Sequence, residues 1–121
     1  FKSILAFAKS PVGMRMRNAF LNETLKREQP FVMSVPASEA DPSYPEDETI
    51  LVQGIIDAWF PEGDEIVLVD YKTDRVKEAG ELKKRYEKQL AYYQQALERT
   101  TGKKVKEKII YSLALDEELV L

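Results

Sequence analysis

Four consecutive apolar residues, Ile66 to Val69, are the feature that most constrains how this chain folds. A strand that is apolar at every position is covered on both faces, as the central strands of α/β sheets are. Two ionisable residues, Asp70 and Lys72, follow this run directly. Because alternate residues of a strand point to the same side, both side chains share one face. They lie at the carboxyl end of the strand, where α/β folds commonly bind ligands.

The rest of the chain predicts one α/β domain with a mixed sheet around this strand. Ser10 and Pro11 are typical of a helix start, and we expect a short helix through about Arg17. Apolar residues recur at three to four positions and predict a long helix that ends at Thr101-Gly102. This stripe consists of Leu82, Tyr86, Leu90, Tyr93 and Leu97. Strands are expected at residues 26–35, 50–60, 65–72 and 105–115, with a partner at 119–121, an edge position at Pro30 and a loop over 36–48.

Composition excludes several kinds of site. The 121 residues are 44% hydrophobic and 32% charged, which is typical of one globular domain. Cysteine and histidine are both absent, so disulfides, iron–sulfur clusters and thiolate or imidazole metal sites are excluded. No apolar run approaches the roughly 20 residues that cross a bilayer, and we expect a cytoplasmic location without membrane contact. Phe1 stands first without a signal-peptide layout, which predicts a fragment of a longer chain.

The position of Asp57 follows from a predicted hairpin. If Pro61–Asp64 forms a four-residue turn, Phe60 pairs with Glu65 and Asp57 pairs with Leu68. Asp57 then shares a face with Asp70 as a diagonal neighbour, roughly 7–8 Å away at the backbone. A register slip of one residue would send Asp57 to the other face.

Two carboxylates on one partly covered face repel each other unless a proton or a cation lies between them. Oxygen ligands favour Mg²⁺ or Mn²⁺ over zinc. Such an ion lowers the pKa of a bound water and stabilises charge on a phosphate, while Lys72 orients the water or offsets that charge. These parts suit phosphodiester hydrolysis. An Asp-x-Lys triplet also occurs by chance, and Asp57 could instead end a strand in an ion pair with Arg75.

Three segments in order carry a resemblance to a known family. Gly54-Ile55-Ile56-Asp57, Val69-Asp70-Tyr71-Lys72-Thr73-Asp74 and Gln89-Leu90-Ala91-Tyr92-Tyr93 resemble the motifs of RecB-type nucleases, in the PD-(D/E)xK superfamily. Arg27-Glu28-Gln29-Pro30-Phe31, Pro36-Ala37-Ser38-Glu39 and Val52-Gln53-Gly54 are similar to the C-terminal nuclease domain of AddA (RexA) subunits. The resemblance implies a restriction-endonuclease-like core, with a mixed β-sheet flanked by helices, formed by residues 1–121 as a single domain.

The resemblance also implies roles for individual residues. Asp57 and Asp70 would be metal ligands, helped by the backbone carbonyl of Tyr71. Lys72 would be the catalytic lysine. Glu28 is a candidate for an upstream acid of the same site.

Gln89 and Tyr93 match the family's Gln-x-x-x-Tyr motif, which borders the active centre. Their spacing of four places them on one helical face. For Tyr93, a packed core aromatic is an equally good interpretation. A basic cluster could guide DNA through phosphate contacts, although a solvated helix face explains it equally well. It consists of Arg75, Lys77, Lys83, Lys84, Arg85 and Lys88.

The activity implied is that of a Mg²⁺-dependent DNA exonuclease (Mn²⁺ being the other candidate ion), acting in double-strand-break repair and recombination. It would cut single strands made by an attached ATP-dependent helicase, beside an AddB (RexB)-type partner subunit. RecB-type nucleases usually carry a metal-binding histidine on an upstream helix, which is expected before Phe1, so the isolated chain is expected to be poorly active. The lack of cysteine argues against the AddB subunit itself. Two alternatives are a non-catalytic module that binds DNA or a partner, and another superfamily branch, such as a restriction or CRISPR-adaptation enzyme.

Overall fold

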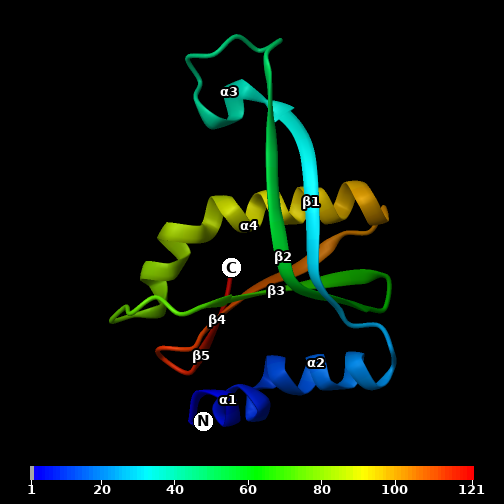
Figure 1. Cartoon of the computed structure of the whole chain (residues 1–121), viewed down its shortest axis with the longest axis vertical. Helices are drawn as coiled ribbons and strands as arrows, with labels where there is room; N and C mark the ends of the chain where they lie inside the picture. The colour runs from blue at the N-terminus through cyan, green and yellow to red at the C-terminus, as the bar shows by residue number, and fades with distance from the viewer. Residues whose placement is uncertain (1) are drawn as a thin grey trace.

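The computed structural model describes residues 2–121 and contains a five-stranded mixed sheet between two helical layers (Figure 1). The strand order is β1-β2-β3-β4-β5, in which β3 and β4 are parallel and the other pairs are antiparallel. This confirms the expected α/β fold. The elements are α1 (Lys2–Lys9), α2 (Pro11–Leu21), β1 (Lys26–Pro36), α3 (Ala37–Ala40), β2 (Thr49–Glu62), β3 (Glu65–Lys72), α4 (Ala79–Thr101), β4 (Val105–Ser112) and β5 (Glu117–Val120).

The predicted central strand β3 is buried on both faces. Val67 and Val69 pack in a cluster with α2, whereas Ile66 and Leu68 pack in a second cluster with α4. All four side chains are fully buried. Each such side chain contributes roughly 1.5–3 kcal/mol through the removal of apolar surface from water. The even positions of β3, which lead to Asp70 and Lys72, therefore face α4.

The helix ends follow the predicted caps. The Ser10 side chain accepts a hydrogen bond from the Gly13 backbone at 3.0 Å and begins α2. Gly102 ends α4 in the left-handed conformation, with a φ of 70°. The structure adds two helices that the sequence patterns did not indicate: α1, and the short α3 inside the predicted 36–48 loop. In α1, Phe7 packs edge-on against rings of β3 and β4, which holds the helix on the sheet.

The predicted turn between β2 and β3 is wrong. Glu62 pairs with Glu65 and Pro61 pairs with Ile66, so the loop contains only Gly63 and Asp64. Gly63 has a φ of 64°, which a two-residue hairpin turn requires and glycine adopts without strain. The register is shifted by two residues from the prediction. An even shift leaves every side chain on its predicted face.

The paired strands β1 and β2 bend sharply at the level of Asp57 in β2. Residues 58–62 of β2 pair with β3, whereas residues 49–56 pair only with β1. Ile56 packs towards α4 and Ala58 towards α2, although alternate residues of a regular strand share a face. Opposite Asp57, Glu28 has a left-handed φ of 51° and is missing from the pairing register. Residues 29–56 thus rise as an arm over α4 (Figure 1), and we call the place where β2 leaves β3 the fork.

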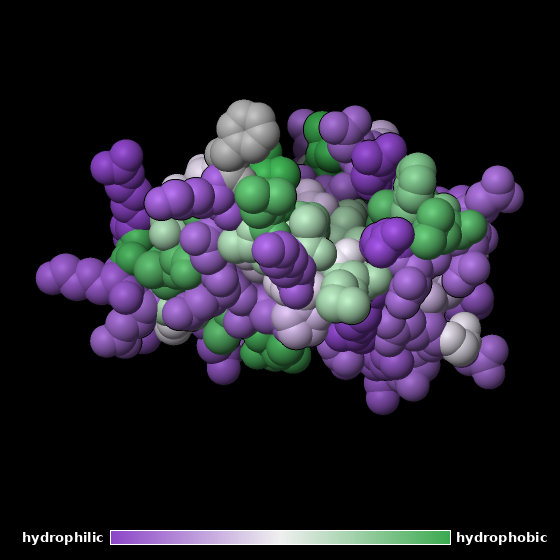
Figure 2. Space-filling view, turned by 90° about the horizontal axis from the view of Figure 1, so that it is seen from below, coloured by the Kyte–Doolittle hydropathy of each residue, from purple (hydrophilic) through white to green (hydrophobic). Residues whose placement is uncertain are grey.

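The outer side of α1 and α2 carries exposed apolar side chains. Viewed from below, hydrophobic groups lie there among hydrophilic ones (Figure 2). The residues concerned are Ile4, Leu5, Met14, Phe20 and Leu21. Among residues 2–121, no helix is both long enough and apolar enough to cross a bilayer.

Arg15 joins α2 to the sheet through two carboxylates. Its guanidinium donates to Glu62 at 2.9 and 2.7 Å and to Glu107 at 2.9 and 3.2 Å. Lys106 Nζ lies 3.1 Å from Glu62 Oε1. The hydrogen bond from Arg15 lowers the pKa of Glu62 to about 2. This network fixes the helix at the end of the sheet away from the fork.

The Glu62→Gln variant should lower the free energy of unfolding at pH 7 by about 1 kcal/mol, a value discounted because the pair is partly exposed. Since the pKa of Glu62 is depressed on folding, its contribution is present above pH 4.5 and is lost as the pH falls towards 2. Urea unfolding between pH 7 and pH 2.5 measures this, with exposed Glu39→Gln as the control. If the variant loses the same free energy of unfolding at pH 2.5 as at pH 7, the Glu62 carboxylate does not stabilise the fold in this way.

Candidate active site

Asp57 and Asp70 come together at the fork from neighbouring strands. Asp57 Oδ2 accepts a hydrogen bond from the Tyr71 backbone N–H at 2.9 Å, which ties its carboxylate to β3. Asp70 is only 2% exposed. The Asp57 carboxylate is one of the groups that raise the pKa of Asp70. Asp57 and Asp70 each adjoin the last pair of the β2–β3 register, Ala58 with Val69.

The environment of Asp70 disfavours a negative charge. Burial raises the pKa of Asp70 from 3.8 to about 6. Lys72 opposes this increase, and Asp57 adds to it. A carboxyl pair in such surroundings is relieved by a proton or by a cation.

Lys72 is held by groups from both β3 and α4. Its Nζ lies 2.8 Å from Asp70 Oδ2 and donates a hydrogen bond to Gln89 Oε1 at 2.9 Å. The same ammonium lies 3.9 Å from the centre of the Tyr86 ring, within range of a cation–π interaction. The contact with Asp70 is a short, buried ion pair. Asp70 Oδ2 is buried, and the Lys72 ammonium lies against it.

Tyr86 and Asp74 complete this arrangement, and the sequence patterns did not single them out as site residues. The Tyr86 hydroxyl donates to Asp74 Oδ2 at 2.7 Å, and Arg85 forms an ion pair with the same oxygen at 3.0 Å. The hydrogen bond to Asp74 fixes the ring beneath Lys72. Tyr86 looked like one more member of the apolar stripe of α4. The available signal was its spacing of three from Gln89, which places both on one helical face.

Tyr93 was predicted to be either a packed core aromatic or a residue that borders the active centre. Its ring is 7% exposed and packs edge-to-face against Phe31, with centroids 5.4 Å apart. Burial raises the pKa of Tyr93, and the charges of Asp70 and Asp57 add to the increase. The residue is thus a core aromatic that also adjoins the acidic pair.

The other predicted site residues are placed differently. Glu28 is exposed on β1. Within residues 2–121, no three acidic side chains gather closely enough to hold a metal ion, so Glu28 is not brought to the pair. The Tyr71 ring lies on the opposite face of the sheet, packed against Phe7, with its hydroxyl 3.6 Å from Met16. The Tyr71 side chain therefore points away from the acidic pair, and its backbone carbonyl stays the predicted metal ligand.

The donor set fits a hard divalent cation. Asp57 and Asp70 offer carboxylate oxygens, and Asp70 is so deeply buried that its negative charge is poorly solvated. The chain contains no histidine or cysteine, so oxygen is the donor type available. Magnesium, calcium and manganese prefer oxygen ligands. The lysine beside the pair supplies positive charge but cannot act as a metal ligand while it is protonated.

The Asp70→Asn variant should unfold at a higher temperature than the unsubstituted protein at pH 8 in EDTA. Because the folded-state pKa is raised to about 6, ionisation of Asp70 destabilises the fold above that pH and not below about pH 4. The expected gain is about 1–3 kcal/mol above pH 6, vanishing towards pH 4. Thermal melts measure it, with exposed Asp64→Asn as the matched control. A variant that is less stable at pH 8 would contradict this electrostatic account.

Comparisons with known proteins identify the family. Residues 6–119 match the PD-(D/E)XK nuclease superfamily, whose nucleases generally use divalent metal ions. The chain is 45% identical over 117 residues, 93% of its length, to an ATP-dependent helicase/nuclease subunit of Clostridium botulinum (strain Loch Maree). It is 42% identical over the same length to the protein of that name from Clostridium kluyveri. It spans 9% of the length of each relative. With its mixed sheet, flanking helices and paired carboxylates, the chain belongs to the PD-(D/E)XK nuclease superfamily.

Proposed function

We propose that this chain is the metal-dependent exonuclease domain of a longer helicase–nuclease and cuts single strands of DNA. The observation that carries the proposal is the buried pair of Asp57 and Asp70, with Lys72 held beside it. The relatives are named ATP-dependent helicase/nuclease subunits, which supports a nuclease joined to a helicase. Their name also favours this branch of the superfamily over restriction or CRISPR-adaptation enzymes. Work in double-strand-break repair and recombination, in the cytoplasm, is part of the proposal.

Asp57 and Asp70 would hold Mg²⁺ or Mn²⁺, together with the carbonyl of Tyr71. When bound, the ion supplies a water of lowered pKa and positive charge next to the scissile phosphate. Asp70 is suited to this task because burial leaves its carboxylate poorly solvated.

Lys72 would orient the attacking water or offset the negative charge that grows on the phosphate. A preorganised cation in a buried site stabilises such charge without a reorganisation step. Gln89 accepts a hydrogen bond from the ammonium, and the face of the Tyr86 ring supports it. These contacts restrict a flexible side chain to one position beside Asp70. Gln89 and Tyr86 therefore act through Lys72, as positioning residues.

The same proposal includes the remainder of a longer protein. The exposed apolar side chains of α1 and α2 support packing of this domain against other parts of such a protein. An AddB (RexB)-type subunit is the proposed partner. DNA is the proposed substrate, delivered as single strands by the helicase motor.

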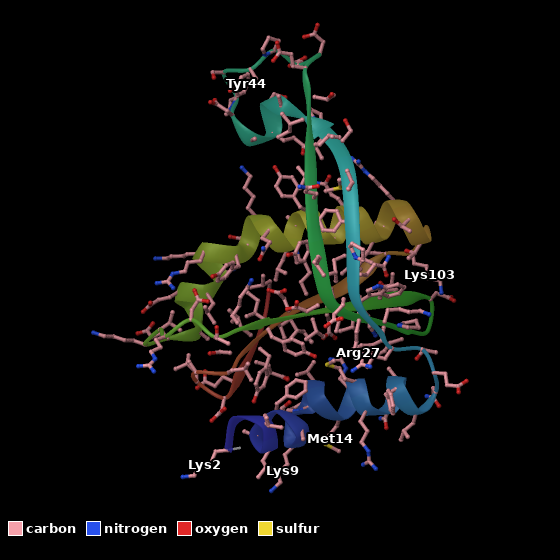
Figure 3. The ribbon with its side chains drawn as sticks, viewed as in Figure 1. Lys2, Lys9, Met14, Arg27, Tyr44 and Lys103 are labelled. Carbon is pink, nitrogen blue, oxygen red and sulfur yellow. The ribbon has the colours of Figure 1, made fainter. Side chains whose placement is uncertain are left out.

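The Asp70→Ala and Lys72→Ala variants of the full-length protein should lose DNA cleavage at least about 100-fold, because each removes charge that the transition state needs. ATP-dependent unwinding should persist, since the motor is a separate part. Cleavage of labelled single-stranded oligonucleotides in Mg²⁺ measures the loss. Lys103→Ala, an exposed lysine remote from the fork, is the control (Figure 3). Undiminished cleavage by either active-site variant would falsify the proposed roles.

A second candidate function is a non-catalytic module that binds DNA or a partner subunit. One observation favours it: Glu28 stays apart from the acidic pair.

Titration with Mg²⁺ or Mn²⁺ separates the two candidates. The nuclease proposal expects either ion to raise the melting temperature of the unsubstituted protein, because binding to the folded state stabilises it. Asp57→Asn and Asp70→Asn should abolish that increase, and Asp64→Asn should retain it. A melting temperature that no divalent ion changes would favour the scaffold.

A further inference from the structure

A pocket of about 310 Å³ opens at the fork between the arm and α4. Its volume is at the low end of the range for small-molecule sites. The wall on the arm comes from both strands, and the wall on α4 comes from two successive turns. The lining residues are Phe31, Val52, Gln53, Gly54, Lys88, Gln89, Tyr92 and Tyr93.

The chemistry of this pocket differs from that of the whole chain. Among the lining residues, all of which the structure describes, Lys88 alone carries a charge. The chain as a whole has a net charge of −3. Phe31 and Tyr92 are partly exposed aromatic residues, and the exposed Gln53 lies at the rim. A flat, largely apolar ligand with hydrogen-bonding edges and an attached anion fits these features.

The inner wall is tightly packed at Gly54. A Cβ there would lie 3.1 Å from the Phe31 ring and 3.3 Å from the Tyr93 ring, so the pair of rings closes directly over the glycine. Tyr93 is buried in this pair, whereas Tyr92, the preceding residue on α4, remains partly exposed. Tyr92 is thus the aromatic face that a ligand entering along α4 would meet.

The pocket is continuous with the proposed active site. Gln89 lines the pocket and also accepts the hydrogen bond from Lys72. Tyr93, in the same wall, lies close enough to Asp57 and Asp70 for their charges to raise its pKa. A group bound in the pocket would therefore be a near neighbour of a phosphate held at the acidic pair.

We infer that this pocket binds an unstacked nucleobase of a single-stranded DNA substrate, next to the phosphate to be cut. The inference rests on the proposed nuclease function and adds a reason for single-strand preference. Bases stack on aromatic side chains without regard to sequence, and Lys88 can contact the neighbouring phosphate. A base within a duplex stays paired and stacked, so it reaches the pocket only after the strands separate. The pocket thus selects for strands that have already been unwound.

The test uses the full-length protein, Mg²⁺ and a labelled single-stranded oligonucleotide in which one abasic tetrahydrofuran unit is moved along the chain. The abasic unit removes a base and leaves the phosphates in place. Cleavage at one phosphate, at a fixed offset from the abasic unit, should slow about tenfold, in line with the contribution of a stacked base. Intact oligonucleotide and duplex of the same sequence are measured alongside.

Variants of Tyr92 connect this effect to the pocket. Tyr92→Leu keeps apolar volume against the arm but removes the aromatic face, so it should cut intact and abasic strands at similar rates. Tyr92→Phe should restore the tenfold difference. Tyr44→Leu is the matched control at the tip of the arm, far from the pocket, and should keep the difference (Figure 3).

The outcomes separate the pocket from the nuclease proposal. Equal cleavage of intact and abasic strands by the unsubstituted protein overturns the pocket inference alone, and would indicate a pocket filled by an apolar side chain of another part of the protein. This comparison of intact and abasic strands needs no variant, so it tests the pocket inference even if Tyr92→Leu fails to fold. An abasic effect that survives in a folded Tyr92→Leu also overturns the inference. If the unsubstituted protein cuts no DNA in either Mg²⁺ or Mn²⁺, the nuclease proposal itself fails.

Discussion

The hydrogen bond from the Tyr71 N–H to Asp57 is the interaction on which the rest of the structure depends. Residues of β2 that precede Ala58 do not pair with β3. The Asp57 carboxylate accepts the hydrogen bond of the Tyr71 N–H in place of a backbone carbonyl of β2. An unpaired buried backbone donor costs on the order of 1–3 kcal/mol, so the side chain has a structural task. That task holds one acid of the pair beside the other. The same separation of strands opens the space in which a substrate can reach them.

Helix α4 supplies both apolar packing and the polar contacts around Lys72. Leu90 and Leu97 pack on the sheet, while Gln89 and Tyr86 reach the ammonium from neighbouring positions. Because the helix is held by its apolar contacts, its polar side chains are presented at fixed positions. Rigid support of this kind places catalytic groups more accurately than a loop does. The site is thus a product of core packing as much as of its own charges.

Local patterns predicted the elements well and the bend poorly. The apolar run of β3 and the glycine at the end of α4 have local causes, and both predictions are confirmed. Pro61 suggested a turn, yet it pairs with Ile66 inside the hairpin, because proline is tolerated near a strand end. The resulting error of two residues preserved the shared face of Asp57 and Asp70. The bend coincides with the left-handed backbone of Glu28, a non-glycine residue that gives no sequence signal for it. The contact of Tyr86 with Lys72 joins elements that only the tertiary fold brings together.

The attachment of Asp57 to the main chain of β3 has a thermodynamic consequence. One carboxylate oxygen is already engaged by the Tyr71 amide, so an incoming cation that recruits this oxygen competes with the end of the strand for it. Cation affinity and fraying of that strand end are then reciprocally linked, each altering the other by the same factor. Residues that only stiffen or loosen this corner of the sheet would therefore tune the affinity for the cation without ever touching it.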